Sequence, residues 1–332
     1  MTLRFKIQIF LLPVVLAVIL VGLSVLWSLD AIEQPIQTKD TIEIEVASGS
    51  SLKKLINALD DQGLINNDVF LKAYIRVSDK YKNIKVGVYE AKPLETLDDF
   101  LTRVVNGKVK LFSLTLIEGL TWKQWKQQIL AHPAIIDDLD ESELLRNLQI
   151  EGNSLEGWLL PETYALTKPT SASEFVTRLV TEMRTELNLQ WQNRQGMLPY
   201  QSPYEALIMA SIIEKETGLA SERPHIAAVF VNRLNIGMRL QTDPTIIYGL
   251  GDRFDGDIKR VHLREKTPYN TYVIDGLPPT PIAMPSKLAI IAALNPIQSD
   301  DLYFVAKGDG SHQFSKTLAE HNAAVRKYQL KK

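Results

Sequence analysis

Residues 7–29 form an uncharged apolar run, IQIFLLPVVLAVILVGLSVLWSL, which constrains the rest of the chain most strongly. As a helix rising about 1.5 Å per residue, this run spans roughly 35 Å, enough to cross the hydrocarbon core of a bilayer. A secretory signal usually has a shorter apolar region followed by a small-x-small cleavage site, whereas the exit here reads WSLDAIEQ. We therefore predict a retained membrane-spanning helix, with a cleaved signal peptide as the alternative.

Charges flanking this run predict its orientation. Arg4 and Lys6 precede it without an acidic neighbour, and the far side is acidic. By the positive-inside rule, residues 1–6 form a cytoplasmic tail and everything after about residue 30 lies outside the cytoplasm. The acidic residues on the far side are Asp30, Glu33, Asp40, Glu43 and Glu45.

Composition excludes several classes of function. The 332 residues are 45% apolar and 23% charged, with a net charge of −2 and no long basic run, which argues against nucleic acid as a partner. The absence of cysteine excludes disulfides and thiolate metal sites. The five histidines form no H-E-x-x-H motif, and GDRFDGD at 251–257 lacks EF-hand spacing, so we expect neither a metal nor a cofactor.

The chain after residue 29 is predicted to be α+β throughout. A short polar linker, 30–41, leads to a small module of alternating strands and helices, 42–118, and then to a larger mixed α+β domain, 119–332. The small module is either a spacer or a glycan-binding module. In LEGWLLPETYAL, 155–166, Trp158 and Tyr164 are candidates either for stacking on sugar rings or for packing at a domain junction.

The segment SPYEALIMASIIEKETG, 202–218, has a well-marked helix start. Ser202 is placed as the N-cap, proline follows at the first helical position, and Glu205 completes the form of a capping box. ALIMASII is apolar nearly all round, which predicts a helix buried on most faces, and Gly218 is its predicted end.

Glu214 and Glu216 fall in the last turn of this helix. The macrodipole there disfavours an ionised carboxylate, and burial raises a carboxyl pKa further. A glutamic acid that stays partly protonated near neutral pH is what a general acid requires. The two side chains lie about 200° apart around the helix axis, so at most one faces a cleft. Alternatively, both are solvated at a frayed helix end.

The segments that follow are rich in Tyr, Asn, Gln and Asp, which hydrogen-bond sugar hydroxyls and amides. We predict a helix capped near Ser221 and ending at Gly237, an extended segment at 239–248, and a proline-stiffened wall at 278–285. A hairpin about residues 308–310 should lead into a terminal helix.

Three stretches carry a specific resemblance: ASIIEKETGLASERPHIAAVFVNRLNIGMRLQTDPTIIYGLG, YNTYVIDGLPPTPI and YFVAKGDGSHQFSKTLAEHN. They resemble the YceG-like family of endolytic murein transglycosylases, over nearly the whole chain. The resemblance implies a LysM-like module at 42–118 and a YceG-like catalytic domain at 119–332. It also implies a single-pass protein of the cell inner membrane, with its catalytic domain in the periplasm, where it cuts nascent peptidoglycan strands internally.

The resemblance also implies the chemistry. The family's catalytic glutamate is the second acid of E-K-E-T, which is Glu216 here; the helix argument alone does not choose between Glu216 and Glu214. The product would carry a 1,6-anhydro-MurNAc end, and such cuts are candidates for terminating glycan polymerisation. Cell-wall synthases and division proteins are candidate partners. Predicted substrate contacts are Glu214, Gln241, Asp243, Tyr269, Asn270 and Tyr272.

Two rival functions stay open from the residues alone. A hydrolytic muramidase would use water, with Glu214 or Asp243 as the second carboxylate, and would release reducing ends. A non-catalytic anchored scaffold for cell-wall synthesis would tolerate the loss of both glutamates.

Overall fold

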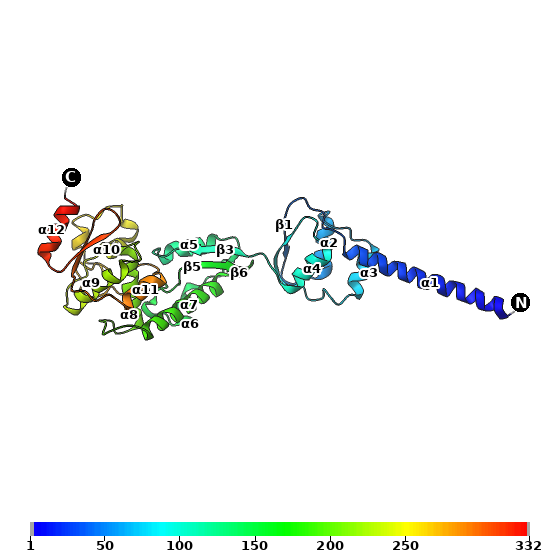
Figure 1. Ribbon diagram of the computed structural model, residues 1–332, viewed down its shortest axis with the longest axis horizontal. Coiled ribbons are helices and arrows are strands. Elements are labelled where there is room, and N and C mark those ends of the chain that lie inside the picture. Colours follow the sequence, from blue (N-terminus) through cyan, green and yellow to red (C-terminus); the bar gives the residue numbers. More distant parts are fainter. Residues whose placement is uncertain (1–2, 331–332) are drawn as a thin grey trace. The chain divides into compact units, whose positions relative to one another are not determined.

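The computed structural model describes residues 3–330 and has the predicted α+β character, with helices accompanied by two-stranded sheets (Figure 1). The chain divides into two compact units. Unit 1 comprises the chain up to Phe112 together with Ala165–Pro169, and unit 2 comprises Ser113–Tyr164 and the chain from Thr170 onward.

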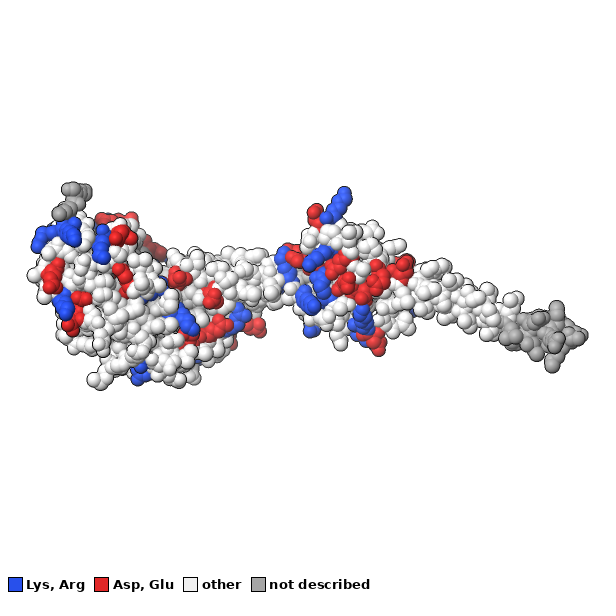
Figure 2. Space-filling view, in the orientation of Figure 1, with Lys and Arg blue, Asp and Glu red and all other residues white. Residues whose placement is uncertain are grey.

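Helix α1, Leu3–Ile32, contains the apolar run. Its stretch Leu12–Ile32 has the length and composition to cross a membrane. The most apolar part of this stretch is not buried inside the structure. In Figure 2 the part of α1 next to the grey residues carries no charged side chain. The helix is therefore compatible with a single-pass membrane anchor.

Unit 1 pairs two antiparallel strands in register from Ile42 opposite Ala91 to Val46 opposite Gly87. Its helices begin at side-chain caps from Ser51, Asp68 and Thr96, which explains their positions in the sequence. The unit contains β1 Ile42–Val46, α2 Leu52–Asp61, α3 Val69–Val77, β2 Gly87–Ala91 and α4 Leu97–Asn106. Whether this unit is LysM-like stays a prediction.

The segment expected to be a polar linker, 30–41, is instead packed into unit 1. Helix α1 continues to Ile32, and both Ile32 and Ile36 lie in the apolar core of the unit. The backbone N–H of Ile36 donates to the carbonyl of Glu95 at 2.8 Å, and Trp27 contacts Phe70 edge to face with ring centroids 5.0 Å apart. Most residues of 30–41 are polar, so the sequence did not show that these few apolar residues belong to the core.

In unit 2, α8 forms the centre of the core and packs against α7, α9, α10 and α11. Most of strand β3 belongs to this unit, although the sequence placed it in the first module. The elements are β3 Phe112–Leu116, α5 Trp122–Ala131, β4 Ile135–Ile136, α6 Glu141–Leu148, β5 Glu162–Leu166, β6 Thr170–Ser171, α7 Ala172–Gln192, α8 Pro203–Glu216, α9 Arg223–Asn235, α10 Asp243–Leu250, α11 Lys287–Leu294, β7 Tyr303–Ala306, β8 His312–Ser315 and α12 Leu318–Tyr328.

Several local predictions can be compared with these elements. The hairpin β7–β8 and the terminal helix α12 are confirmed. Helix α9 begins after Glu222, a neighbour of Ser221, as predicted, but no side chain caps it. The expected extended segment is wrong from Asp243 onward, because the proline after Asp243 suits the first turn of a helix. Trp158 and Tyr164 are buried and pack inside the fold, which argues against contact with sugar.

The structure also reveals an internal repeat. A spacing of 70 residues separates β1 from β3 and α2 from α5, and a spacing of 75 separates β2 from β5 and the start of α4 from that of α7. In both copies the two strands pair with each other. Residues 100–105 read FLTRVV and residues 175–180 read FVTRLV.

Equivalent contacts support the repeat. The Tyr89 hydroxyl donates to the carbonyl of Lys85 at 2.8 Å, and the Tyr164 hydroxyl donates to that of Leu160 at 2.7 Å, four residues earlier in each case. In the first copy the guanidinium of Arg103 stacks on Phe100. The Arg178 guanidinium stacks on Phe175 in the second copy. The two copies therefore share element order, packing and one short stretch of similar sequence.

Candidate active site

The start and end of helix α8 determine where Glu214 and Glu216 lie. The Ser202 side chain accepts the N–H of Glu205, and proline occupies the first turn. The Glu205 carboxylate accepts the N–H of Gln201 at 2.7 Å, one residue before the expected capping-box partner. Nearly every residue of the helix is buried, and the helix ends at Glu216, so that Thr217 rather than Gly218 terminates it.

Glu214 faces the interior of the fold. Its Oε1 accepts a hydrogen bond from Arg223 Nη2 at 2.7 Å, and its Oε2 accepts the backbone N–H of Ser286 at 2.9 Å. The side chain therefore joins the ends of α8, α9 and α11. Because both oxygens are engaged inside the protein, this placement argues against the predicted substrate contact at Glu214.

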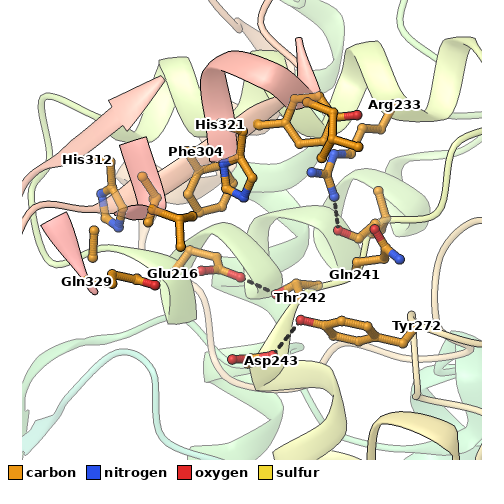
Figure 3. A pocket seen from close by; sticks show the side chains of 16 residues that line it. Glu216, Arg233, Gln241, Thr242, Asp243, Tyr272, Phe304, His312, His321 and Gln329 are labelled. Atoms are coloured by element: carbon orange, nitrogen blue, oxygen red, sulfur yellow. Dashed lines mark hydrogen bonds between the residues drawn. The ribbon is translucent and has the colours of Figure 1, made fainter. Parts of the chain in front are cut away.

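Glu216 points instead into a cavity of about 460 Å³ in unit 2 (Figure 3). The hydroxyl of Thr242 donates to Glu216 Oε1, which fixes the direction of the carboxyl group. The 200° separation predicted from helix geometry thus sends one acid into the core and the other into a cavity. Residues lining the cavity include Glu216, Arg233, Gln241, Thr242, Asp243, Tyr272, Tyr303, Phe304, His312 and His321.

The environment of Glu216 raises its pKa to about 7. Burial is the main cause, and the negative charge of Asp243 adds to it. The hydrogen bond from Thr242 and the positive charge of Arg233 oppose the rise in pKa, because both favour the carboxylate. The raised pKa keeps part of the Glu216 population protonated near neutral pH, as a general acid requires.

Thr242 is itself held in place. Its backbone N–H donates to Thr271 Oγ1 at 3.0 Å, and the N–H of Gln241 donates to the carbonyl of Thr271 at 3.2 Å. Gln241 adopts a φ of +49°, a left-handed conformation that is uncommon for residues other than glycine. This strained backbone next to the acid is typical of a functional site.

Several cavity residues were not among the predicted site residues, and three of them act on Glu216: Thr242, Arg233 and His312. Arg233 is 7% exposed and donates to the carbonyls of Leu302 and Leu240, each at 2.6 Å. His312 lies on strand β8 and pairs with Glu222 at 2.7 Å. Arg233 and His312 both lie within the stretches that carry the family resemblance, but no local pattern marks them as site residues, because α9 and the hairpin β7–β8 bring them to Glu216 only in the fold.

The predicted contacts divide into two groups. Gln241, Asp243 and Tyr272 line the cavity with Glu216, and the Tyr272 hydroxyl donates to Asp243 Oδ1 at 2.7 Å. Tyr269 lines a different cavity. Asn270 is 1% exposed and donates to two backbone carbonyls, which identifies it as a brace of the loop.

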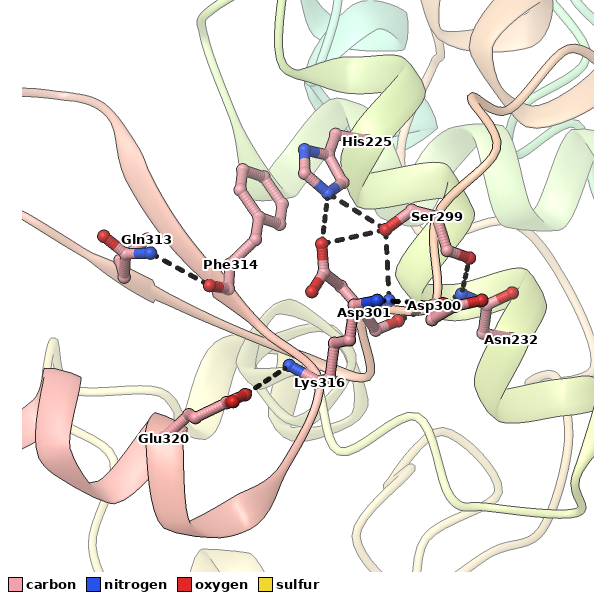
Figure 4. Close-up of polar contacts among 9 residues, drawn as sticks. All are labelled: His225, Asn232, Ser299, Asp300, Asp301, Gln313, Phe314, Lys316 and Glu320. Carbon is pink, nitrogen blue, oxygen red and sulfur yellow. Dashed lines mark hydrogen bonds and ion pairs between the residues drawn. The ribbon is translucent and has the colours of Figure 1, made fainter.

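A second polar cluster surrounds His225 (Figure 4). Nε2 of His225 lies 2.8 Å from Asp301 Oδ2 and 3.4 Å from Ser299 Oγ. Because the serine and the aspartate meet the same ring nitrogen, the three residues do not form a Ser-His-Asp relay. The ring also stacks on Phe314. The cluster therefore fastens α9 to the hairpin. Within residues 3–330, no group of three His, Asp or Glu side chains could hold a metal ion.

The chain is similar in sequence and structure to known proteins. A YceG-like family profile matches residues 44–327. A Bacillus subtilis protein named endolytic murein transglycosylase is 31% identical over 314 residues, covering 88% of this chain and 86% of that protein. A Streptococcus pneumoniae protein of the same name is 26% identical, with 87% and 58% coverage. The crystal structure of a putative yceG-like protein from Listeria monocytogenes is 32% identical, with a TM-score of 0.55, and covers 86% of this chain and 99% of that one. This chain therefore belongs to the YceG-like family.

Proposed function

We propose that this protein is an endolytic peptidoglycan transglycosylase, with Glu216 as its catalytic acid and base. The observation that carries the proposal is the Glu216 carboxyl group, directed into a polar cavity by Thr242 and with a pKa of about 7. The names of the relatives from Bacillus subtilis and Streptococcus pneumoniae support the same reaction.

The reaction needs one carboxyl group. Protonated Glu216 donates its proton to the glycosidic oxygen as the bond from C1 of MurNAc to that oxygen breaks. The resulting carboxylate takes the proton of the MurNAc C6 hydroxyl as the oxygen of that hydroxyl forms a bond to C1. The products are a 1,6-anhydro-MurNAc end and a free GlcNAc hydroxyl, and Glu216 is protonated again. Because the nucleophile is part of the substrate, its effective concentration is high and no water is consumed.

Neighbouring residues have supporting roles in this proposal. Thr242 orients the carboxyl group, and the buried charge of Arg233 stabilises the carboxylate formed after proton transfer. Asp243 opposes ionisation of Glu216, which keeps the acid protonated for the next cycle. Gln241 and Tyr272 supply polar groups for sugar hydroxyls and acetamides.

The location follows from α1. We place residues 7–29 of α1 across the inner membrane, with residues 1–6 in the cytoplasm and everything after about residue 30 in the periplasm, next to newly made strands. In this arrangement residues 42–118 are the predicted LysM-like module. Resistance of the full chain to carbonate extraction, together with protease access to residues 42–332 only from the periplasmic side, would test the placement.

Mass spectrometry of products released from purified peptidoglycan tests the reaction. The wild-type chain should produce anhydro-MurNAc ends, and Glu216→Gln should abolish them. Glu182→Gln, a change at an exposed helix surface, should retain activity and serves as the matched control. Reducing ends would instead support a muramidase that uses Asp243, the other carboxylate at this cavity. Equal activity in the wild-type and Glu216→Gln proteins would refute the role of Glu216.

A further inference from the structure

Unit 2 contains a second cavity, of about 850 Å³, that the proposed reaction does not use. One wall is formed by α5 and the loop before it. The opposite wall is a stripe on α10 formed by Pro244, Ile247 and Tyr248. This volume is within the range of sites that bind small molecules. We refer to it as the α5 cavity.

Consecutive residues line the α5 cavity and the Glu216 cavity at two places in the chain. Lys215 lines the α5 cavity, and its neighbour Glu216 lines the other. In the same way Pro244 lines the α5 cavity and Asp243 the other. The end of α8 and the start of α10 therefore separate the two spaces. An enzyme that cuts within a polymer has to hold sugars on both sides of the scissile bond.

The lining of the α5 cavity suits a sugar. The rings of Tyr248 and Tyr269 meet edge to face with centroids 4.8 Å apart, and both are partly exposed. The exposed parts of these rings offer an apolar surface, whereas their hydroxyls are already bonded, that of Tyr248 to Glu156 and that of Tyr269 to Thr280. The exposed amide of Gln127 lies on the α5 side, where it can reach hydroxyl and acetamide groups. Gln124 offers its amide N–H groups there, because its Oε1 already accepts the N–H of Thr121 at 2.9 Å.

A buried carboxyl group lies in the same wall. Glu156 is 4% exposed, accepts the backbone N–H of Trp122 at 2.9 Å, and accepts the Tyr248 hydroxyl at 3.1 Å. Burial raises the pKa of Glu156 to about 7. The Glu156 side chain therefore connects the start of α5 with Tyr248 on α10. These two bonds keep the two walls of the cavity at a constant separation.

The internal repeat provides an independent observation. Lys123 and Gln127 of α5 are equivalent, at the spacing of 70 residues, to Lys53 and Asn57 of α2. Lys53 and Asn57 also line a cavity, of about 590 Å³, in unit 1. Both copies of the repeat thus present a lysine and, four residues later, an amide on the helix face that borders a cavity.

We propose that the α5 cavity is a glycan subsite that binds N-acetylhexosamine units of the same strand whose glycosidic bond lies at Glu216. This inference rests on the proposed function. The strand passes from the Glu216 cavity over the boundary between α8 and α10, and the amide side chains of α5 hold the sugars beyond the cut.

A pair of neighbouring glutamines allows a matched test. Gln127 lines the cavity, whereas Gln128 is exposed on the same helix and does not line it. Gln127→Trp and Gln128→Trp are introduced into the full chain, each in the wild-type and the Glu216→Gln background. Binding of peptide-free glycan strands is measured in the inactive background, and release of anhydro ends in the active one.

Gln127→Trp should weaken strand binding by about tenfold or more and raise the KM for strands, while Gln128→Trp should leave both nearly unchanged. If both variants bind strands equally well, the subsite inference is wrong, and anhydro products from the wild-type chain would leave the proposed function standing. If no protein binds strands or releases anhydro ends, both proposals fail. Thermal unfolding monitors the fold, and Gln127→Glu, a smaller change, should also weaken binding.

Discussion

The hydrogen bond from Thr242 to Glu216 should set the pH range of the enzyme. Thr242→Val keeps the shape of the side chain and removes the hydroxyl that donates to the carboxylate. The backbone bonds of Thr242 do not depend on this hydroxyl, because they involve its N–H and its carbonyl. The substitution therefore perturbs the acid while retaining the loop that presents it.

The magnitude follows from the strength of such bonds. A hydrogen bond to a charged group contributes about 1.5–3 kcal/mol, and one pKa unit corresponds to about 1.4 kcal/mol. We take the low end because Glu216 keeps part of its surface exposed, although its carboxyl group lies deep enough for burial to dominate the shift of its pKa. The bond favours the ionised form, so its loss should raise the pKa of Glu216 from about 7 by about one unit.

The assay is the pH dependence of anhydro-MurNAc release, with each protein scaled to its own maximum. Activity requires protonated Glu216, so the basic limb of the profile should move to higher pH in Thr242→Val. At pH 8 the scaled rate of the variant should exceed that of the wild type by roughly fivefold. Thr185→Val on α7, whose hydroxyl donates to a helix carbonyl, is the control and should leave the limb in place. A limb that stays in place or moves to lower pH in Thr242→Val would refute the reasoning.

Three further predictions concern stability. Glu214→Gln should lower the free energy of unfolding by about 3 kcal/mol, because it leaves the buried guanidinium of Arg223 without its counter-charge; an unchanged denaturation midpoint would contradict the structural role of Glu214. Glu156 has a pKa raised from 4.5 to about 7, so its favourable contribution is complete below pH 4.5 and is lost as the pH rises through 7. The free energy of unfolding of Glu156→Gln, measured by thermal unfolding, should therefore equal that of the wild type at pH 4 and exceed it by up to about 3 kcal/mol at pH 9. A difference that does not change with pH would count against this reasoning. Gln241→Gly should raise stability by about 1 kcal/mol by relieving the positive φ, as measured by denaturant unfolding, while a loss of stability would show that the side chain braces the loop.

Local sequence patterns predicted much of the fold. Caps and periodicity marked α2, α4, α8 and the final hairpin and helix, because these signals involve residues only a few positions apart. The predictions failed where distant contacts decide. Ile32 and Ile36 look like parts of a linker until the core of unit 1 buries them. The repeat was not recognised from the sequence, because its two copies have few identical residues. They share the spacing of their elements and a few contacts.

The sequence by itself determined that α8 is a buried helix carrying two acids on opposite sides of its last turn, since helix period and end signals are local properties. Only the tertiary structure decided their different positions. Arg223 and Ser286 hold Glu214 inside the fold, and Thr242 directs Glu216 into a cavity. The pKa of a carboxyl group depends on burial and nearby charges, and these come from chain segments far apart in sequence.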